Sequence, residues 1–124
     1  MSRTGETRKS FDAQIRDLEQ ELLKMASFVE QMAADSLRAL QEQDVALAEE
    51  VIRRDDMADQ MDIDIEQRSM CLLALQQPMS KDLRTIATAM KITADLERIG
   101  DFSVDIARTA KTLAGEPYFK PLVD

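Results

Sequence analysis

The chain has 124 residues, and its 16 basic and 24 acidic side chains give it a formal charge of −8. This length allows one domain, and a hydrophobic content of 44% is too high for a disordered chain. An acidic chain without a basic block is a poor binder of nucleic acid, and the absence of histidine excludes Ser-His-Asp triads, histidine-ligated zinc and Glu-x-x-His di-iron sites.

The first predicted element is a long amphipathic helix over roughly residues 10–41, with Ser10 as its N-cap. Its apolar residues alternate between spacings of four and three positions, which is the period of one helix face. These residues are Phe11, Ile15, Leu18, Leu22, Met25, Val29 and Met32. Residues 1–9 lack this pattern, and we expect a disordered N-terminal tail there.

The second predicted element is a helix over roughly residues 45–76, which Asp44 can cap. Its apolar stripe runs through Val51, Ala58, Met61, Ile65, Leu72 and Leu75. The same segment carries a run of acids, which are Asp55, Asp56, Asp59, Asp62, Asp64 and Glu66. Although Asp55 and Asp59 are four positions apart, such a dense run beside arginines is typical of a solvated helix face, and we expect one here.

The third predicted element is a helix over roughly residues 81–114, which follows a break at Pro78 and ends at Gly115. Three long helices joined by short polar turns predict an all-α fold, an up-down-up three-helix bundle over residues 10–115. Residues 116–124 then form a C-terminal extension without a recognisable pattern.

The third predicted helix carries apolar side chains on two nearly opposite faces. One face collects Ile92, Leu96, Ile99, Ile106 and Ala110. The second face collects Leu83, Ile86, Ala87, Met90, Ala94 and Val104. A bundle core covers only one of the two. We therefore expect the second face to bind a partner or another copy of the chain, through Leu83, Ile86, Met90 and Val104, and the protein to be a homo-oligomer.

Acidic side chains interrupt the second face of this helix. Glu97 and Asp101 are four positions apart, and Asp105 lies one turn further along. Carboxylates at this spacing repel each other unless a cation neutralises them, and they can share a hard metal ion. The spacing alone is a weak signal, because Arg98 and Arg108 are alternative sources of neutralising charge.

Two small residues are informative about packing. Gly100 costs about 1 kcal/mol relative to alanine in a helix interior. It is either tolerated without a role or marks the close approach of another backbone. Cys71 lies beside the apolar stripe of the second helix, and we expect a buried thiol that behaves as a small hydrophobic side chain.

The sequence is consistent with a cytoplasmic protein that does not insert into a membrane. No apolar run approaches the roughly 20 residues of a membrane span, and the first residues lack the apolar region of a signal peptide. The single cysteine cannot form a disulfide within the chain, which fits a reducing compartment.

Over roughly residues 10–112 the sequence resembles a known family, the PhoU proteins. The similarity is strongest in the strings DLRTI at residues 82–86 and KITADLERIGD at residues 91–101, preceded by QQP at residues 76–78. The DLERIGD string is far more specific than two acids at helical spacing.

The resemblance implies a fold and a site. Each PhoU repeat is a three-helix bundle, and a typical PhoU protein packs two related repeats together, so residues 116–124 resemble the approach to a second repeat. The family's E-x-x-x-D motif binds multinuclear metal clusters of iron, zinc or manganese type. Carried onto this sequence, the ligands are Glu97 and Asp101, with Asp105 as a less certain addition.

The resemblance also implies a function. PhoU proteins are non-enzymatic negative regulators of bacterial phosphate uptake and phosphate-starvation signalling. The resemblance implies that such a protein links the ATPase subunit of the phosphate ABC transporter to a sensor histidine kinase.

Two other functions remain open on the residues alone. One is a carboxylate-bridged metalloenzyme that uses Asp55 and Asp59 with the acids of the third helix, although the lack of histidine argues against it. The other is a metal-free helical interaction module, in which Arg98 and Arg108 pair with the acids.

Overall fold

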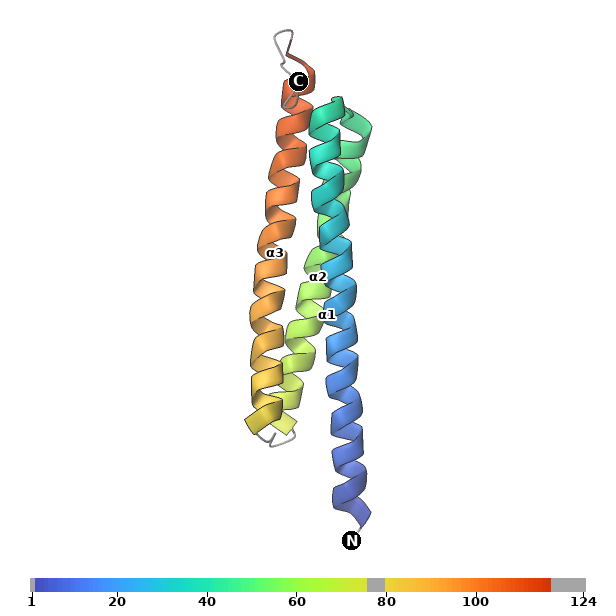
Figure 1. The fold of residues 1–124 in the computed structure, drawn as a ribbon, viewed down its shortest axis with the longest axis vertical. Helices are drawn as coiled ribbons and strands as arrows, with labels where there is room; N and C mark the ends of the chain where they lie inside the picture. Colours follow the sequence, from blue (N-terminus) through green and yellow to red (C-terminus); the bar gives the residue numbers. More distant parts are fainter. Residues whose placement is uncertain (1, 76–79, 117–124) are drawn as a thin grey trace.

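Three long helices make up most of the described chain. The structure is a computed structural model that describes residues 2–75 and 80–116. Helix α1 covers Ser2–Glu42, α2 covers Val45–Leu75 and α3 covers Ser80–Ala114. They run up, down and up beside one another, so α1 begins and α3 ends at opposite ends of an elongated bundle (Figure 1). The predicted all-α three-helix bundle is confirmed.

The described helices do not have the character of membrane spans. Within residues 2–75 and 80–116, none combines the length and the apolar character that crossing a bilayer requires.

Helix α1 begins earlier than the sequence pattern indicates. It starts at Ser2, so the expected N-cap at Ser10 and the expected tail over residues 2–9 are wrong. Arg8 explains part of this difference. Its guanidinium forms an ion pair with the buried Asp82 at the start of α3, lies 3.6 Å from the Asp12 carboxylate and stacks 5.2 Å from the centre of the Phe11 ring. The spacing of apolar residues cannot reveal a helical turn that is stabilised by contacts of an arginine side chain.

The turn between α1 and α2 has the predicted cap. Gln43 adopts a left-handed conformation with φ of 56°, and the backbone N–H of Asp44 donates to the Ala39 carbonyl at 2.9 Å. The Asp44 carboxylate then accepts the Leu47 N–H at 3.0 Å, which confirms Asp44 as the cap of α2. The second break, residues 76–79 with Pro78, lies outside the described residues.

The core follows the stripes predicted for α1 and α2. Its buried side chains from these two helices are Phe11, Ile15, Leu18, Met25, Val29, Met32, Ala39, Ala48, Val51, Ala58, Ile65 and Leu72. One ion pair is buried beside them, because Arg54 of α2 donates to the Asp35 carboxylate of α1 at 2.7 Å and Gln31 donates to the other carboxylate oxygen at 2.9 Å.

Helix α3 buries one stripe, which lies between the two predicted faces. Apart from Ile86 and Val104, the apolar and small residues of the stripe are short; they are Ala89, Thr93, Gly100, Ser103, Ala107 and Ala110. Small side chains let α3 approach its neighbours closely. Large apolar side chains lie on both edges of this stripe, and for that reason the sequence pattern indicates two separate apolar faces.

This packing corrects the expected association face. Ile86 and Val104 are only 0% and 4% exposed, so both belong to the core and cannot contact a partner. Met90 is half-buried and packs against the core, and only Leu83 is an exposed large apolar residue.

Gly100 faces α1 and is buried. A methyl group added at this position would lie 4.0 Å from the Val29 Cγ2 atom, which is an ordinary van der Waals distance. The approach at Gly100 is therefore no closer than an alanine would allow.

Candidate metal centre

The acids of α2 lie on the side of the helix that faces α3, contrary to the expectation of a solvated face. Asp55 and Asp59 are half-buried and Asp62 is 7% exposed, whereas Asp56 and Asp64 are exposed as expected. Spacings of four and three positions place Asp55, Asp59 and Asp62 on one helix face. Exposed acids stand among these three in the sequence, so the acidic run as a whole does not display their spacing.

Three carboxylates from two helices converge along the line where α2 packs against α3, which we call the α2–α3 groove. Asp55 and Asp59 of α2 and Asp101 of α3 each offer one oxygen, and these oxygens all lie within 4.8 Å of one another. Asp101 is exposed, so the group opens to solvent on that side. The structure thus brings Asp101, predicted as a ligand, together with two acids of a helix that was expected to be solvated.

Glu97, the other predicted ligand, lies one helical turn from Asp101 and meets Asp62. Burial is the largest cause that raises the pKa of Asp62 to about 7, followed by a hydrogen bond with the Glu97 side chain and by the charges of Glu97, Glu66 and Asp59. The Asp62 Oδ1 atom is buried without a hydrogen-bond partner. Sequence reasoning did not single out Asp62, although its position seven residues after Asp55 was a usable signal.

Mutual repulsion also acts on Asp55. Burial raises the pKa of its carboxyl, and the charges of Asp59, Asp101 and Asp56 raise it further. Arg108 acts in the opposite direction but does not cancel these effects. The groove therefore holds more negative charge than its neighbours neutralise.

The nearby arginines are engaged with other acids. Arg98 lies 3.6 Å from the Asp95 carboxylate, and Arg108 lies 4.0 Å from that of Asp105. Among the described residues, neither arginine forms an ion pair with Glu97 or Asp101. Asp105 itself is exposed and lies outside the group of three converging carboxylates.

The side chains present suit a hard cation. All of the donors are carboxylate oxygens, which are the ligands that magnesium, calcium, manganese and ferric ions prefer. The unpartnered Asp62 Oδ1 is an oxygen that a cation or a proton would satisfy. The acids from Asp55 to Asp101 thus fit the type of centre that the resemblance implies.

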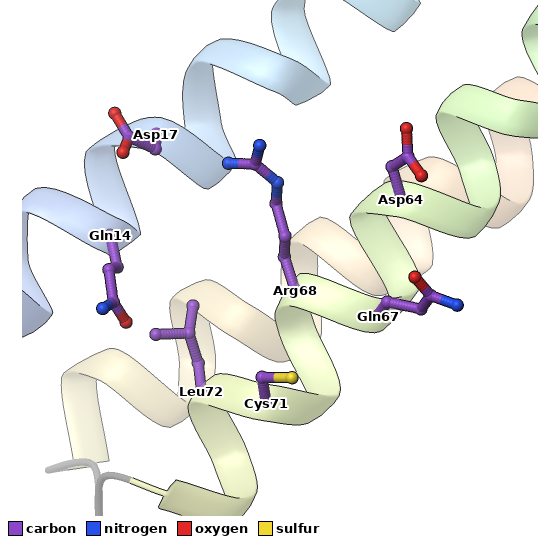
Figure 2. A pocket seen from close by; sticks show the side chains of 7 residues that line it. All are labelled: Gln14, Asp17, Asp64, Gln67, Arg68, Cys71 and Leu72. Carbon is purple, nitrogen blue, oxygen red and sulfur yellow. The ribbon is translucent and has the colours of Figure 1, made fainter.

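A hollow lies on another side of the bundle. It is a groove of about 620 Å³ between α1 and α2, lined by Gln14, Asp17, Asp64, Gln67, Arg68, Cys71 and Leu72 (Figure 2). Cys71 is exposed there, so the expectation of a buried thiol is wrong. The next residue, Leu72, is buried in the core. Successive residues of a helix are rotated by about 100° about its axis, so Cys71 lies outside the buried stripe.

A family model decides the affiliation of the chain. The model of the PhoU domain matches residues 22–110, which include the second half of α1, all of α2, most of α3 and every acid of the groove. The chain belongs to the PhoU family. The resemblance noted on the DLERIGD string is thereby confirmed.

Relatives of this PhoU domain carry one recurring description. The chain is 45% identical over 113 residues to the phosphate-specific transport system accessory protein PhoU homolog of Clostridium acetobutylicum, covering 90% of this chain and 52% of that protein. It is 42% identical over 111 residues to the homolog of Aquifex aeolicus, covering 90% and 50%. The chain spans about half the length of the curated relatives it matches.

Solved structures agree with this affiliation. The crystal structure of PhoU from Pseudomonas aeruginosa superposes with a TM-score of 0.84 at 38% identity, over 88% of this chain and 53% of that one. The phosphate transport system regulatory protein PhoU from Streptococcus pneumoniae gives a TM-score of 0.81 at 34% identity, over 89% and 52%.

Proposed function

We propose that this PhoU domain acts as a negative regulator of bacterial phosphate uptake and phosphate-starvation signalling. The observation that carries the proposal is its membership of the PhoU family, together with relatives named as accessory proteins of the phosphate-specific transport system. The role is non-enzymatic and cytoplasmic, and the domain works as an adaptor.

The adaptor has two partners in this proposal. One is the ATPase subunit of the phosphate ABC transporter, and the other is the sensor histidine kinase of the phosphate response. When phosphate is plentiful, the domain holds both in a restrained state. This part rests on the family resemblance alone.

The adaptor binds metal through the groove between α2 and α3. Asp55, Asp59 and Asp101 would hold a cation at the open end of the groove, and Glu97 and Asp62 would extend the ligand set towards the core. The bound cation would supply positive charge that offsets the repulsion among these acids and ties α2 to α3.

The metal proposal is tested by elemental analysis of protein purified without chelators. The double variant Glu97→Gln/Asp101→Asn is compared with Asp56→Asn/Asp64→Asn, which removes the same charge from exposed positions of α2. The first variant should lose most of its iron, zinc or manganese, and the second should keep the wild-type content. Equal metal content in all three proteins would remove Glu97 and Asp101 as ligands.

The regulatory proposal is tested separately in the organism that encodes the chain. Deletion of the gene should raise phosphate uptake and the expression of phosphate-starvation genes in phosphate-rich medium, and the wild-type gene should restore repression. Unchanged uptake and expression would contradict the regulatory role whatever the metal content of the protein.

One observation favours a second candidate, the carboxylate-bridged metalloenzyme. Asp55 and Asp59 do converge with Asp101, as that hypothesis requires. Redox or hydrolytic turnover by metal-loaded protein, lost in Asp55→Asn/Asp59→Asn, would favour it over the adaptor.

A further inference from the structure

The groove between α1 and α2 lies apart from the proposed metal site. Its volume of about 620 Å³ falls within the range of about 300–1,000 Å³ that is typical of small-molecule pockets. Gln67, Arg68 and Cys71 line it from α2, and Gln14 and Asp17 line it from α1 (Figure 2). The α1–α2 groove is therefore a separate candidate binding site, built from the side chains of two helices.

Two opposite charges line this groove without pairing with each other. Asp17 belongs to α1 and Arg68 to α2, and Figure 2 shows the Arg68 side chain extending across the groove towards α1. Among the described residues, neither side chain forms an ion pair, whereas Arg53 and Arg54 of the same helix do. A cation and an anion that stand unpaired on opposite walls of a groove match a zwitterionic ligand, which carries both charges.

The only thiol of the chain lines the same groove. Cys71 is exposed and free. It follows Arg68 by three positions and Gln67 by four, and these spacings place the three side chains side by side on α2. The amides of Gln67 and of Gln14 across the groove each offer a hydrogen-bond donor and an acceptor. The ligand that matches the whole lining carries a carboxylate, an ammonium group, peptide groups and sulfur.

We propose that the α1–α2 groove binds a small thiol derived from cysteine and holds it as a mixed disulfide with Cys71. Arg68 pairs with a carboxylate of the ligand, and Asp17 pairs with its ammonium group. The amides of Gln14 and Gln67 bind the peptide groups of a ligand such as glutathione. The inference does not rest on the proposed function, because none of these residues belongs to the metal site.

The mixed disulfide forms by exchange with the oxidised, disulfide form of the small thiol. The Cys71 thiolate attacks one sulfur of that disulfide, so that one S–S bond forms and one S–S bond breaks. The other half of the disulfide leaves as a thiolate and takes up the proton that Cys71 released. The small disulfide is the only oxidant required, and an excess of the reduced small thiol reverses the reaction. The occupancy of the groove therefore follows the ratio of oxidised to reduced small thiol.

The first test follows the rate of exchange by intact mass spectrometry of the whole chain with a chelator present. Because the chain has one thiol, every adduct lies on Cys71, and Cys71→Ser should give none. Glutathione disulfide is compared with cystamine, a disulfide that carries ammonium groups but no carboxylate. Arg68→Gln should slow the exchange with glutathione disulfide about threefold to fivefold and should not slow the exchange with cystamine. Arg68→Lys, which keeps the charge, should retain most of the wild-type rate.

Matched controls separate the groove from the general charge of the chain. Arg16→Gln removes the same charge from an exposed position of α1 outside the groove and should leave both rates near those of wild type. Asp17→Asn should slow the exchange with cystamine about threefold relative to Glu19→Gln, which removes an exposed acid of α1 outside the groove. Equal rates with glutathione disulfide in wild type, Arg68→Gln and Arg16→Gln would overturn the proposal, because Cys71 would then be an exposed thiol without a ligand site. Equal slowing of both disulfides by Arg68→Gln would also overturn it, because Arg68 would then act on the thiol and not on the ligand.

The second test measures whether the groove holds the attached ligand. The glutathione adduct is bonded to α2 and pairs with Asp17 of α1, so it should link the two helices and raise the urea midpoint of the wild-type chain above that of the unmodified chain. In Arg68→Gln/Asp17→Asn the adduct should give no such increase. Alkylation of Cys71 with iodoacetamide is the control modification, because it blocks the thiol with a small neutral group and should not raise the midpoint. A glutathione adduct that leaves the wild-type midpoint unchanged or lowers it would overturn the proposal.

Discussion

The carboxyl group of Asp62 in α2 lies within hydrogen-bonding reach of that of Glu97 in α3, and the Oδ1 atom of Asp62 is buried without a hydrogen-bond partner. A hydrogen bond between the two carboxyl groups needs a proton, because two carboxylate ions have no donor between them. A proton and a metal cation can therefore compete for the same carboxyl groups of the groove. Each of them offsets a repulsion that the fold itself creates by packing the acids of α2 against α3.

The first prediction concerns the stability of the metal-free protein as a function of pH. The pKa of Asp62 is about 7 in the folded chain and near 3.8 in a model compound, so between these values the folded state holds a proton that the unfolded state has lost. Stability then falls as pH rises towards 7. Asp62→Asn cannot ionise. Relative to wild type, it should gain about 2–3 kcal/mol in unfolding free energy between pH 5 and pH 8.

Urea unfolding in the presence of a chelator measures this difference. Asp56→Asn is the control, because it removes an acid from an exposed position of α2. Its stability relative to wild type should change little between the two pH values. The same small change for Asp62→Asn would show that Asp62 ionises normally in the folded protein.

The second prediction concerns the competition between proton and metal. Because carboxylates must be deprotonated to bind a cation, the apparent affinity for manganese should rise with pH until Asp62 is ionised, at about pH 7. Isothermal titration at several pH values measures this rise. In Asp62→Asn the affinity should be lower, and it should level off at a lower pH. A wild-type affinity that is flat between pH 5 and pH 8 would exclude Asp62 from the ligand set.

The fold was largely predictable, because two of the three helices bury a regular stripe of large apolar residues. The α1 residues from Phe11 to Met32 show this, as they bury the face that their spacing predicts. Helix α3 was harder, since Ala89, Thr93 and Gly100 line its buried side. Hydrophobic patterns weight large side chains, whereas close helix packing uses small ones.

The candidate site was only half predictable. Glu97 and Asp101 could be named because they stand in a specific string, but their partners on α2 could not. The position of Asp55 and Asp59 opposite Asp101 depends on the relative rotation and register of two antiparallel helices. The local sequence determines neither the rotation nor the register. The same acids of α2 are therefore compatible with a solvated face or with a site between α2 and α3.

The third prediction concerns the ion pair between α1 and α2. Burial would raise the pKa of Asp35, but hydrogen bonds from Arg54 and Gln31 outweigh it and the pKa is lowered. Asp35→Ala leaves Arg54 partly buried without its carboxylate and should cost about 2–3 kcal/mol in unfolding free energy. Arg38→Ala breaks an exposed pair with Glu42 and should cost less than about 1 kcal/mol. Equal costs in chemical unfolding would show that the buried pair contributes no more than a surface one.

The fourth prediction concerns Gly100, which sits in the interior of α3 against α1. Alanine has a higher helix propensity and reduces the freedom of the unfolded chain, and its methyl group would meet Val29 at an ordinary contact distance of 4.0 Å. Gly100→Ala should therefore stabilise the protein by about 0.5–1 kcal/mol, seen as a higher midpoint of thermal unfolding. Gly115→Ala, just beyond the end of α3, should change stability by less than about 0.5 kcal/mol. Destabilisation by Gly100→Ala would mean that α1 and α3 need a closer approach at this level than the distance to Val29 indicates.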